Sequence, residues 1–405
     1  MLDGSRSDAL QKALAVTRTS TILDSVVTVK IGERTIWWNF RSVHKILYLF
    51  SPTLFTLVNA IPAMRQLRTV HLWGIFLART YLCCILSSSH LTHLILDDVR
   101  VPNISKLPPP PQNLRKLSIR AMYSWEAIEP LIARLATSLE YLELKWCRFL
   151  QPRRAQLPSF PCLTELWHHQ SPSRNYGNEA LLNELFRLVP QVTHLHLYGR
   201  VLYRQITAFP RSLQHLSIEE MMLTEQTFGP ILCPQLVSLS LRCSPGWGLN
   251  CLILSSFIRD HFPRITCLHL DGPWSIPTTL VLARSQHHVQ MLKLSLETTC
   301  GLDRKGKYFS FPPEIPSDIS LVPAALQSLI LEVVQPDYEL EQSVPTCTQW
   351  IDDNVLPPVT GFGGPDLKNI DVLFVRLESE LERERVVRRR WVKSPNGDWL
   401  MEECL

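Results

Sequence analysis

A six-residue pattern with apolar residues at its first, fourth and sixth positions recurs along most of the chain. Its clearest form is residues 192–197, which read VTHLHL. The other clear copies start at Leu91, Leu114, Leu139, Leu213, Leu236, Ile265 and Leu326, and weaker copies start at Leu67, Leu163, Val289 and Leu367. This internal repeat constrains the architecture more than any other feature, because repeats of this kind pack on their neighbours and the core grows lengthwise.

The spacing between the copies indicates what connects them. From Leu67 to Val289 the copies start 21–29 residues apart, and the last two intervals are longer. Segments with helical spacing of apolar residues lie between copies, at residues 77–87, 125–137, 178–189 and 252–262. A proline precedes many copies by two or three residues: Pro111, Pro161, Pro190, Pro210, Pro234, Pro263 and Pro323. Because proline cannot continue a helix, the order strand, loop, helix, proline, strand is predicted.

The repeats and their prolines resemble leucine-rich repeats, and more narrowly the repeat regions of fungal F-box/leucine-rich-repeat proteins, from about Leu67 to Val372. The resemblance implies an α/β fold, a leucine-rich-repeat solenoid with a curved parallel β-sheet on the concave side and helices and loops on the convex side. It also implies a substrate receptor or adaptor of a cullin-based ubiquitin ligase. No Leu-Pro-x-Glu start typical of an F-box occurs in residues 1–66. We therefore expect the F-box to be absent from this chain, and a Skp-type adaptor to bind only if one is supplied.

Three domains are predicted. Residues 1–66 form an irregular N-terminal cap, with a strand at residues 26–31 and helices within residues 42–60. Residues 67–375 form the solenoid, with insertions at 297–325 and 333–365. Residues 376–405 form a second cap, with a charged helix at 377–390 and a β-hairpin turning at Asn396-Gly397. Glutamates precede Arg388, Arg389 and Arg390, so ion pairs within that helix are preferred over nucleic-acid contacts.

Composition narrows the possible partners and compartments. The 405 residues include 41 basic and 37 acidic ones, a balance that argues against nucleic acid or a membrane as the main partner. The 11 cysteines form no Cys-x-x-Cys pair, and several lie in or beside the repeats as small apolar residues. Such thiols suit a reducing compartment, and the N-terminus lacks the pattern of a signal peptide. A monomeric cytoplasmic or nuclear protein is therefore expected.

The polar positions of the repeat carry the candidate binding residues. Side chains alternate faces along a strand, so the third, fifth and seventh positions should line the concave face. Aromatic residues and histidines flanked by charges gather there in the middle repeats: Tyr141, Glu143, Glu165, Trp167, His169, His194, His196, Tyr198 and His215. Because Trp and Tyr are enriched at interface hot spots, this patch is predicted to bind a protein ligand. The alternative is a set of solvated residues without a partner.

Two further alternatives were weighed for these residues. Histidines on adjacent strands (His169, His194, His196 and His215) could converge on zinc. Two histidines alternating along one strand lie about 6.5–7 Å apart, however, so a polar ladder without metal or other cofactor is preferred. The second alternative is a regulator of an enzyme, similar to ribonuclease inhibitors or GTPase-activating repeat proteins, which would use the concave Arg120 or Arg242. No catalytic motif is present, so no catalytic residue and no enzyme activity is predicted.

Overall fold

The chain is described by a computed structural model in which two compact units can be distinguished, residues 1–199 (unit 1) and 200–405 (unit 2). Each unit is described by itself. The structure describes the following residues: 15, 18–32, 52–75, 79–99, 112–120, 125–145, 158–169, 183, 185–198, 209–219, 233, 235–242, 258–259, 261–272, 288–297, 325–336, 366–379 and 382–404.

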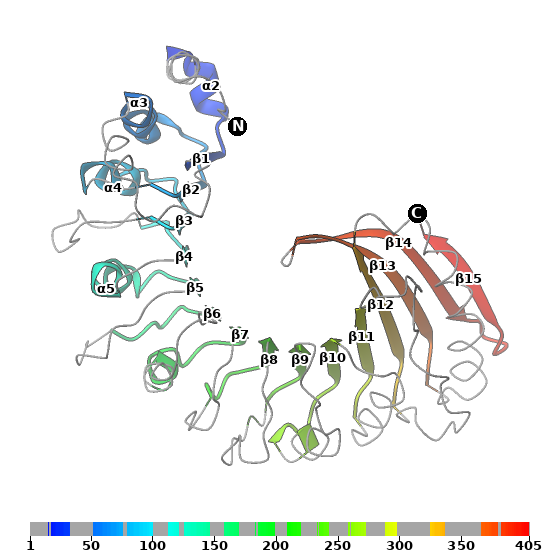
Figure 1. Ribbon diagram of the computed structural model, residues 1–405. Coiled ribbons are helices and arrows are strands. Elements are labelled where there is room, and N and C mark those ends of the chain that lie inside the picture. The colour runs from blue at the N-terminus through cyan, green and yellow to red at the C-terminus, as the bar shows by residue number, and fades with distance from the viewer. Residues whose placement is uncertain are drawn as a thin grey trace, which may run out of the picture. The chain divides into compact units, whose positions relative to one another are not determined.

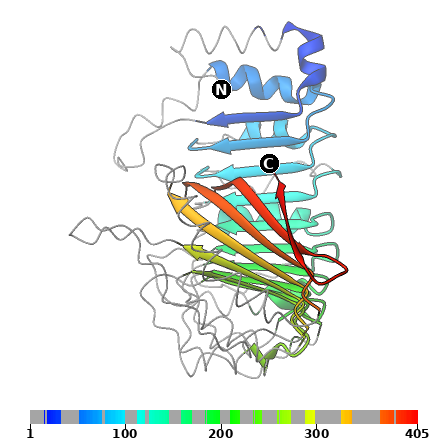
Figure 2. The same cartoon turned by 90° about the vertical axis from the view of Figure 1, so that its right-hand side faces the viewer.

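Unit 1 is built on a parallel sheet in which the strands follow in chain order. The strands are β1 (Thr28–Gly32), β2 (Thr69–Trp73), β3 (His93–Asp97), β4 (Lys116–Arg120), β5 (Tyr141–Lys145), β6 (Glu165–His169) and β7 (His194–Tyr198). Its helices are α2 (Ser20–Ser25), α3 (Pro52–Ala60), the 3-10 helix η2 (Ile61–Ala63), α4 (Arg79–Leu86) and α5 (Trp125–Leu135). Helices α3, α4 and α5 lie on one side of this sheet (Figure 1), and the strands point the same way (Figure 2).

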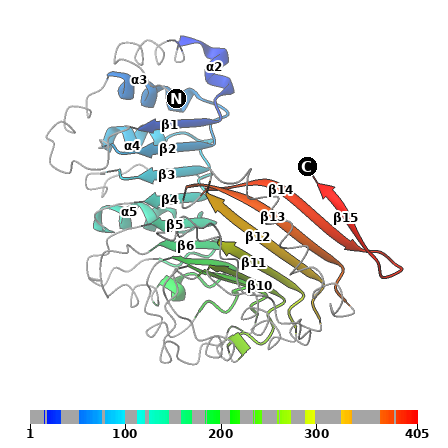
Figure 3. The same ribbon diagram turned by 45° about the vertical axis from the view of Figure 1, so that its right-hand side comes forward.

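Unit 2 contains the same kind of repeat, and its strand pairing changes from parallel to antiparallel near the C-terminus. Strands β8 (His215–Glu219), β9 (Ser238–Arg242), β10 (Cys267–Gly272), β11 (Met291–Glu297), β12 (Ser328–Pro336) and β13 (Asn369–Ser379) are parallel neighbours in chain order. Strands β14 (Glu382–Lys393) and β15 (Trp399–Cys404) pair antiparallel with their predecessors and lie side by side in Figure 3.

Equivalent repeat positions face each other across the strands, which places the apolar residues in one core. Leu72 lies opposite Leu96, Leu96 opposite Ile119, and Ile119 opposite Leu144. All four side chains are at most 1% exposed. Burying a Leu or Ile side chain contributes roughly 1.5–3 kcal/mol, so this ladder of apolar residues stabilises the stack. The parallel in-register repeats with helices on one side confirm the leucine-rich-repeat solenoid fold.

The prolines that precede the strands, which were predicted to end helices, also form turns. Pro161, Pro190 and Pro263 each occupy the second position of a tight turn just before a strand. In the second of these turns the backbone N–H of Val192 donates to the carbonyl oxygen of Val189 at 3.2 Å. The fixed φ of proline suits this position, so the residue directs the chain into the next strand.

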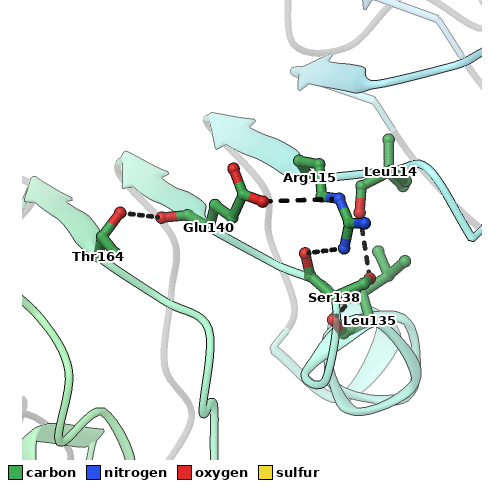
Figure 4. A network of polar contacts seen from close by, with 6 residues as sticks. All are labelled: Leu114, Arg115, Leu135, Ser138, Glu140 and Thr164. Carbon is green, nitrogen blue, oxygen red and sulfur yellow. Dashed lines mark hydrogen bonds and ion pairs between the residues drawn. The ribbon is translucent and has the colours of Figure 1, made fainter.

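Polar contacts also fix the start of each strand (Figure 4). The backbone N–H of Glu140 donates to the carbonyl oxygen of Arg115 at 2.8 Å, and that of Thr164 donates to the carbonyl oxygen of Glu140 at 3.0 Å. The Thr164 hydroxyl donates to the same Glu140 oxygen at 3.2 Å. Arg115 lies 3.6 Å from the Glu140 carboxylate, and Ser138 donates its hydroxyl proton to the carbonyl oxygen of Leu114. These contacts join adjacent repeats along the edge where the strands begin.

The prediction of a charged helix at residues 377–390 is wrong. Most of this stretch belongs to β13 and β14, which pair antiparallel with register shifts near Phe374 and Leu377. In the sheet register Arg376 lies opposite Glu384, and Arg389 opposite Glu403. Opposite charges across strands stabilise a sheet much as ion pairs one turn apart stabilise a helix, so the charge pattern alone did not distinguish the two. The predicted hairpin that follows is present as β14 and β15.

The other predicted segments are found in part. The strand predicted at residues 26–31 corresponds to β1, which pairs in parallel with β2 and so belongs to the sheet. Helix α3 lies within the predicted helical residues 42–60, of which 42–51 lie outside the described residues. Helix α2 was not predicted. Strand β12 runs to Pro336, into the predicted insertion at 333–365, while residues 298–324 and 337–365 lie outside the described residues. Among the described helices, none combines the length and apolar character that crossing a membrane requires.

Candidate functional site

The first, third and fifth residues of strands β1 to β7 share one face of the unit 1 sheet, here called the open face. The alternation is visible in β2 and β3, where these three positions are partly exposed and the two between them are buried. Eight of the nine candidate residues lie on the open face of unit 1: Tyr141, Glu143, Glu165, Trp167, His169, His194, His196 and Tyr198. The ninth, His215, is the first residue of β8 in unit 2.

Four of these residues form an aromatic cluster on β6 and β7: Trp167, His169, His196 and Tyr198. The rings of Trp167 and His196, which are opposite each other in the sheet register, stack with centroids 3.8 Å apart and planes 14° apart. The rings of His169 and Tyr198 stack more loosely, with centroids 5.1 Å apart and planes 29° apart. The Trp167 indole N–H donates to Glu165 at 2.6 Å, which fixes the orientation of the indole. The strand register therefore assembles a pre-ordered aromatic surface.

A second group lies one strand before the aromatic cluster, around Glu143. Arg120 donates two hydrogen bonds to the Glu143 carboxylate, from Nε to Oε1 at 2.9 Å and from the guanidinium NH2 nitrogen to Oε2 at 3.0 Å. The Tyr141 hydroxyl donates to Oε2 at 3.3 Å. Although burial opposes ionisation, the hydrogen bonds and charge of Arg120 lower the pKa of Glu143. Glu143 is thus a buried carboxylate held by a two-point ion pair.

Three polar residues of the open face are buried rather than solvated. Glu143, Lys145 and His169 are only 5%, 6% and 7% exposed. The prediction that such positions are solvent-facing is therefore wrong for these three residues. Neighbouring strands are only about 4.8 Å apart, so large side chains on both sides cover one another. The partly exposed Trp167 and Tyr198 and the exposed His194 remain accessible to a partner.

Burial keeps two histidines of the open face neutral at physiological pH. Desolvation lowers the pKa of His169 to about 4, and the nearby Glu143 charge only partly offsets it. Desolvation and the charge of Lys116 lower the pKa of His93 to about 4. His169 and His93 therefore contribute neutral imidazole rings, rather than cations, to the open face.

A serine and a histidine approach each other on the open face without forming a catalytic triad. His93 Nε2 lies 3.2 Å from the Ser118 hydroxyl, which belongs to the next strand. Ser118 is only 1% exposed, so a substrate cannot reach its oxygen. The carboxylate of Glu143 is engaged by Arg120 and Tyr141, whereas a triad needs the carboxylate on the second imidazole nitrogen. This group is a hydrogen-bond network within the sheet.

The corresponding face of unit 2 carries ion pairs across strands. Arg242 lies 3.6 Å from the carboxylate of Glu219 on one side and 3.5 Å from that of Asp271 on the other. Further contacts join Lys293 to Glu332, Arg390 to Asp371, and His269 to both Ser240 and Ser295. Both arginines considered for enzyme regulation, Arg120 and Arg242, are therefore engaged by carboxylates of their own unit.

The histidines of the aromatic cluster are used for stacking. Within the part of the chain that the structure describes, no group of three or more His, Cys, Asp or Glu side chains is arranged to hold a metal ion. The rings of His169 and His196 both lie against aromatic neighbours. This arrangement orients the imidazoles as parts of an aromatic surface.

The sequence placed the candidate residues on one face but missed their pairing. It did not predict the two-point ion pair of Arg120 with Glu143 or the stacking of Trp167 on His196. The signal for both is the alignment of successive repeats, because equivalent positions become lateral neighbours about 4.8 Å apart. Arg120 is the last residue of its strand and Glu143 the middle residue of the next, so this contact runs diagonally.

No protein-family model and no curated protein matches the chain. Similar solved structures include an internalin from Listeria monocytogenes and TLR13 in a complex with ssRNA13, each with a sequence identity of 13% and a TM-score of 0.34. The internalin alignment covers 80% of this chain and 87% of the internalin chain. The TLR13 alignment covers 78% of this chain and 52% of the other, so this chain spans about half the length of TLR13. Similarity at this level carries no argument about function.

Proposed function

We propose that the chain is a non-enzymatic recognition protein that binds another protein on the open face of unit 1, with the aromatic cluster at the centre of the interface. The stacked Trp167 and His196 rings carry this proposal. They are partly exposed, and their mutual stacking fixes them before a partner arrives. Pre-ordered aromatic side chains lose little conformational entropy on binding, which is typical of interface hot spots.

The surroundings of the cluster support the same proposal. Glu165 holds the Trp167 indole, and His169 stacks on Tyr198 from the neighbouring strand. Both aromatic pairs are carried by strands of a packed sheet, and sites on such rigid elements are held more accurately than sites on loops. In this proposal the other candidate residues of unit 1 outside the cluster, Tyr141, Glu143 and His194, surround or support the contact.

The finer proposal follows from the resemblance to F-box/leucine-rich-repeat proteins. In it, the chain is a substrate receptor or adaptor of a cullin-based ubiquitin ligase, and the F-box comes from elsewhere. A pull-down with a purified Skp-type adaptor tests the ligase role separately from the recognition proposal. We expect the adaptor not to bind this chain alone, because in this proposal the F-box comes from elsewhere. We further propose that the protein works in the cytoplasm or nucleus, since its described cysteines are free thiols, and that it is a monomer.

The alternative function, regulation of an enzyme, receives less support from the described residues. A GTPase-activating role needs an arginine that can reach a nucleotide. Arg120 is held by Glu143, and Arg242 lies between two carboxylates. Either arginine would have to leave an ion pair before it could act on a bound enzyme.

A double variant, Trp167→Ala with His196→Ala, tests the recognition proposal. We expect partners captured by cross-linking in cells to be lost by at least about tenfold, because each hot-spot residue typically contributes about 2 kcal/mol or more. The captured proteins are quantified by mass spectrometry. The matched control is Phe55→Ala, which removes an aromatic side chain 56% exposed on helix α3.

Far-ultraviolet circular dichroism of each purified variant checks that the fold is retained. The proposal fails if a folded double variant captures the same partners at the wild-type level. It also fails if Phe55→Ala causes the same loss, since the effect would then not belong to the open face.

A further inference from the structure

The aromatic cluster presents ring edges, rather than ring faces, to a partner. The Trp167 and His196 rings lie on neighbouring strands and stack at 3.8 Å with planes only 14° apart. Their ring normals therefore run along the sheet, from strand to strand, and their edges point away from it. Aromatic edges carry partial positive charge, whereas the faces that attract cations are turned toward each other. Ring edges favour oxygen acceptors such as carboxylates and carbonyl groups.

The charges of the open face point to the same class of partner. Two of its carboxylates are engaged, Glu143 by Arg120 and Glu165 by the Trp167 indole. The charged side chains that are exposed on the described open face are two lysines, Lys30 and Lys116, whereas Asp97 and Glu165 are partly buried. The most exposed charges of this face are therefore positive, although the whole chain is nearly balanced.

Lys116 is placed to act together with the aromatic cluster. Its Nζ atom lies 5.9 Å from the centre of the Tyr141 ring, on the strand beside it. No described carboxylate forms an ion pair with it. Strand β4 is separated from Trp167 on β6 by one strand, so the two backbones lie about 10 Å apart across the sheet. A single short segment of a partner can span that distance.

We propose that the partner presents an acidic segment to the open face of unit 1, with one carboxylate paired to Lys116 and further oxygen acceptors against the edges of the Trp167 and His196 rings. This inference rests on the proposed function and adds the chemistry of the partner. The geometry argues against two other classes of ligand. A basic segment would meet the ammonium group of Lys116, and the two ring faces that Trp167 and His196 turn toward each other are closed to cations and to nucleic-acid bases.

Selection of peptides tests the proposal without knowledge of the natural partner. The full chain is immobilised and used to select from a displayed library of random peptides of about 12 residues, long enough to cross several strands. Peptides that also bind the Trp167→Ala/His196→Ala variant are discarded. We expect the remaining peptides to be enriched in Asp and Glu. The same selection on Lys116→Glu should reduce this enrichment and favour Lys or Arg.

Affinities of a selected acidic peptide provide the quantitative test. At a salt concentration of about 50 mM, Lys116→Glu should weaken binding by about fivefold to tenfold, and added salt should reduce this difference. The matched control is Arg187→Glu, which reverses an exposed charge in the segment before β7. It should leave the affinity within about twofold of the wild-type value.

Three results would overturn the proposal, and they separate it from the proposed function. Peptides that need Trp167 and His196 but lack an acidic bias would refute the acidic partner and leave protein recognition intact. Failure to select any peptide that needs these two residues would refute both. Binding of a single-stranded oligouridylate that is lost in the double variant would replace the acidic peptide with a nucleic acid.

Discussion

Charged residues on the open face stabilise the sheet by pairing with each other across strands. Glu143 is 6% exposed at its side chain and accepts two hydrogen bonds from Arg120, which is 34% exposed. The burial of a carboxylate is costly unless hydrogen bonds and an opposite charge offset it. Arg120 is therefore a structural residue of unit 1, which the sequence pattern alone did not indicate.

Removing Arg120 should leave a buried carboxylate without its main partner. We expect Arg120→Ala to lower the free energy of unfolding by on the order of 2–3 kcal/mol, measured by urea denaturation. The control is the double variant Arg120→Met/Glu143→Leu, which removes both charges and should recover most of the loss. A single variant as stable as wild type would show that the ion pair contributes nothing.

His168 is a second polar residue whose effect on stability depends on its burial. It occupies the core position filled by Leu144 on β5 and Leu197 on β7, and it is 1% exposed. Desolvation lowers its pKa to about 4 from an ordinary value of 6.5. As the pH falls through the interval from about 6.5 to about 4, the unfolded chain binds a proton that the folded chain does not. His168 therefore makes the protein less stable as the pH falls in this interval.

Replacing His168 with leucine should remove this contribution. We expect the stability advantage of His168→Leu over wild type to grow by about 2 kcal/mol between pH 7.5 and pH 5, as measured by urea denaturation at both pH values. His168→Gln is the matched control, because it is polar but does not titrate and should show the same change with pH. An advantage that is equal at both pH values would contradict the assignment.

At the scale of elements, the C-terminal strands show how pairing overrides local patterns. Residues 377–390 combine alternating charges with Val386 and Val387. Their charge pattern is compatible with either a helix or a strand. The structure selects the strand, because β13 supplies an edge and β14 and β15 extend the sheet across it. The buried Trp391, opposite Ile370, anchors this pairing on the core side.

The turn of the C-terminal hairpin depends on one glycine. Gly397 has a φ of +94°, and a Cβ placed there would meet no atom within 4 Å. Space is therefore available, but a side chain is disfavoured by the left-handed backbone. We expect Gly397→Ala to destabilise the hairpin by about 1–2 kcal/mol, seen as faster hydrogen exchange of the β14 and β15 amides.

Gly397→Asn is the control for this prediction, because asparagine tolerates the left-handed conformation better than alanine. It should accelerate exchange less than Gly397→Ala does. If the two variants exchanged at the same rate as wild type, the turn would not depend on this backbone conformation.

At the scale of the whole molecule, repeats contact mainly their sequence neighbours, so stability is distributed along the stack. The described cysteines are distributed in the same way and differ in accessibility: Cys162 is exposed, Cys83, Cys84 and Cys267 are intermediate, and Cys233 is buried. Burial raises the pKa of the Cys233 thiol to about 12. The thiolate is the reactive form of cysteine. Burial therefore protects Cys233 both by blocking reagents and by raising the pKa of its thiol.

Alkylation should therefore report the folded state of the chain. In native buffer at about pH 8, we expect iodoacetamide to modify Cys162 before the other four described cysteines and to leave Cys233 unmodified until urea unfolds the protein. Peptide mass spectrometry measures both sites in one experiment. Modification of Cys233 in the native protein at the rate of Cys162 would contradict the buried placement.

The sequence by itself determined where most strands begin and which side chains share a face. Both follow from a repeat with apolar residues at fixed positions and from the alternation of side chains along a strand. Trp167 and His196 were placed on one face for this reason. Only the tertiary structure decided that their rings stack, that Arg120 reaches Glu143, and that residues 377–390 pair as strands. The stacked rings and the ion pair join residues 29 and 23 positions apart, so they depend on the register between strands, which no local pattern specifies.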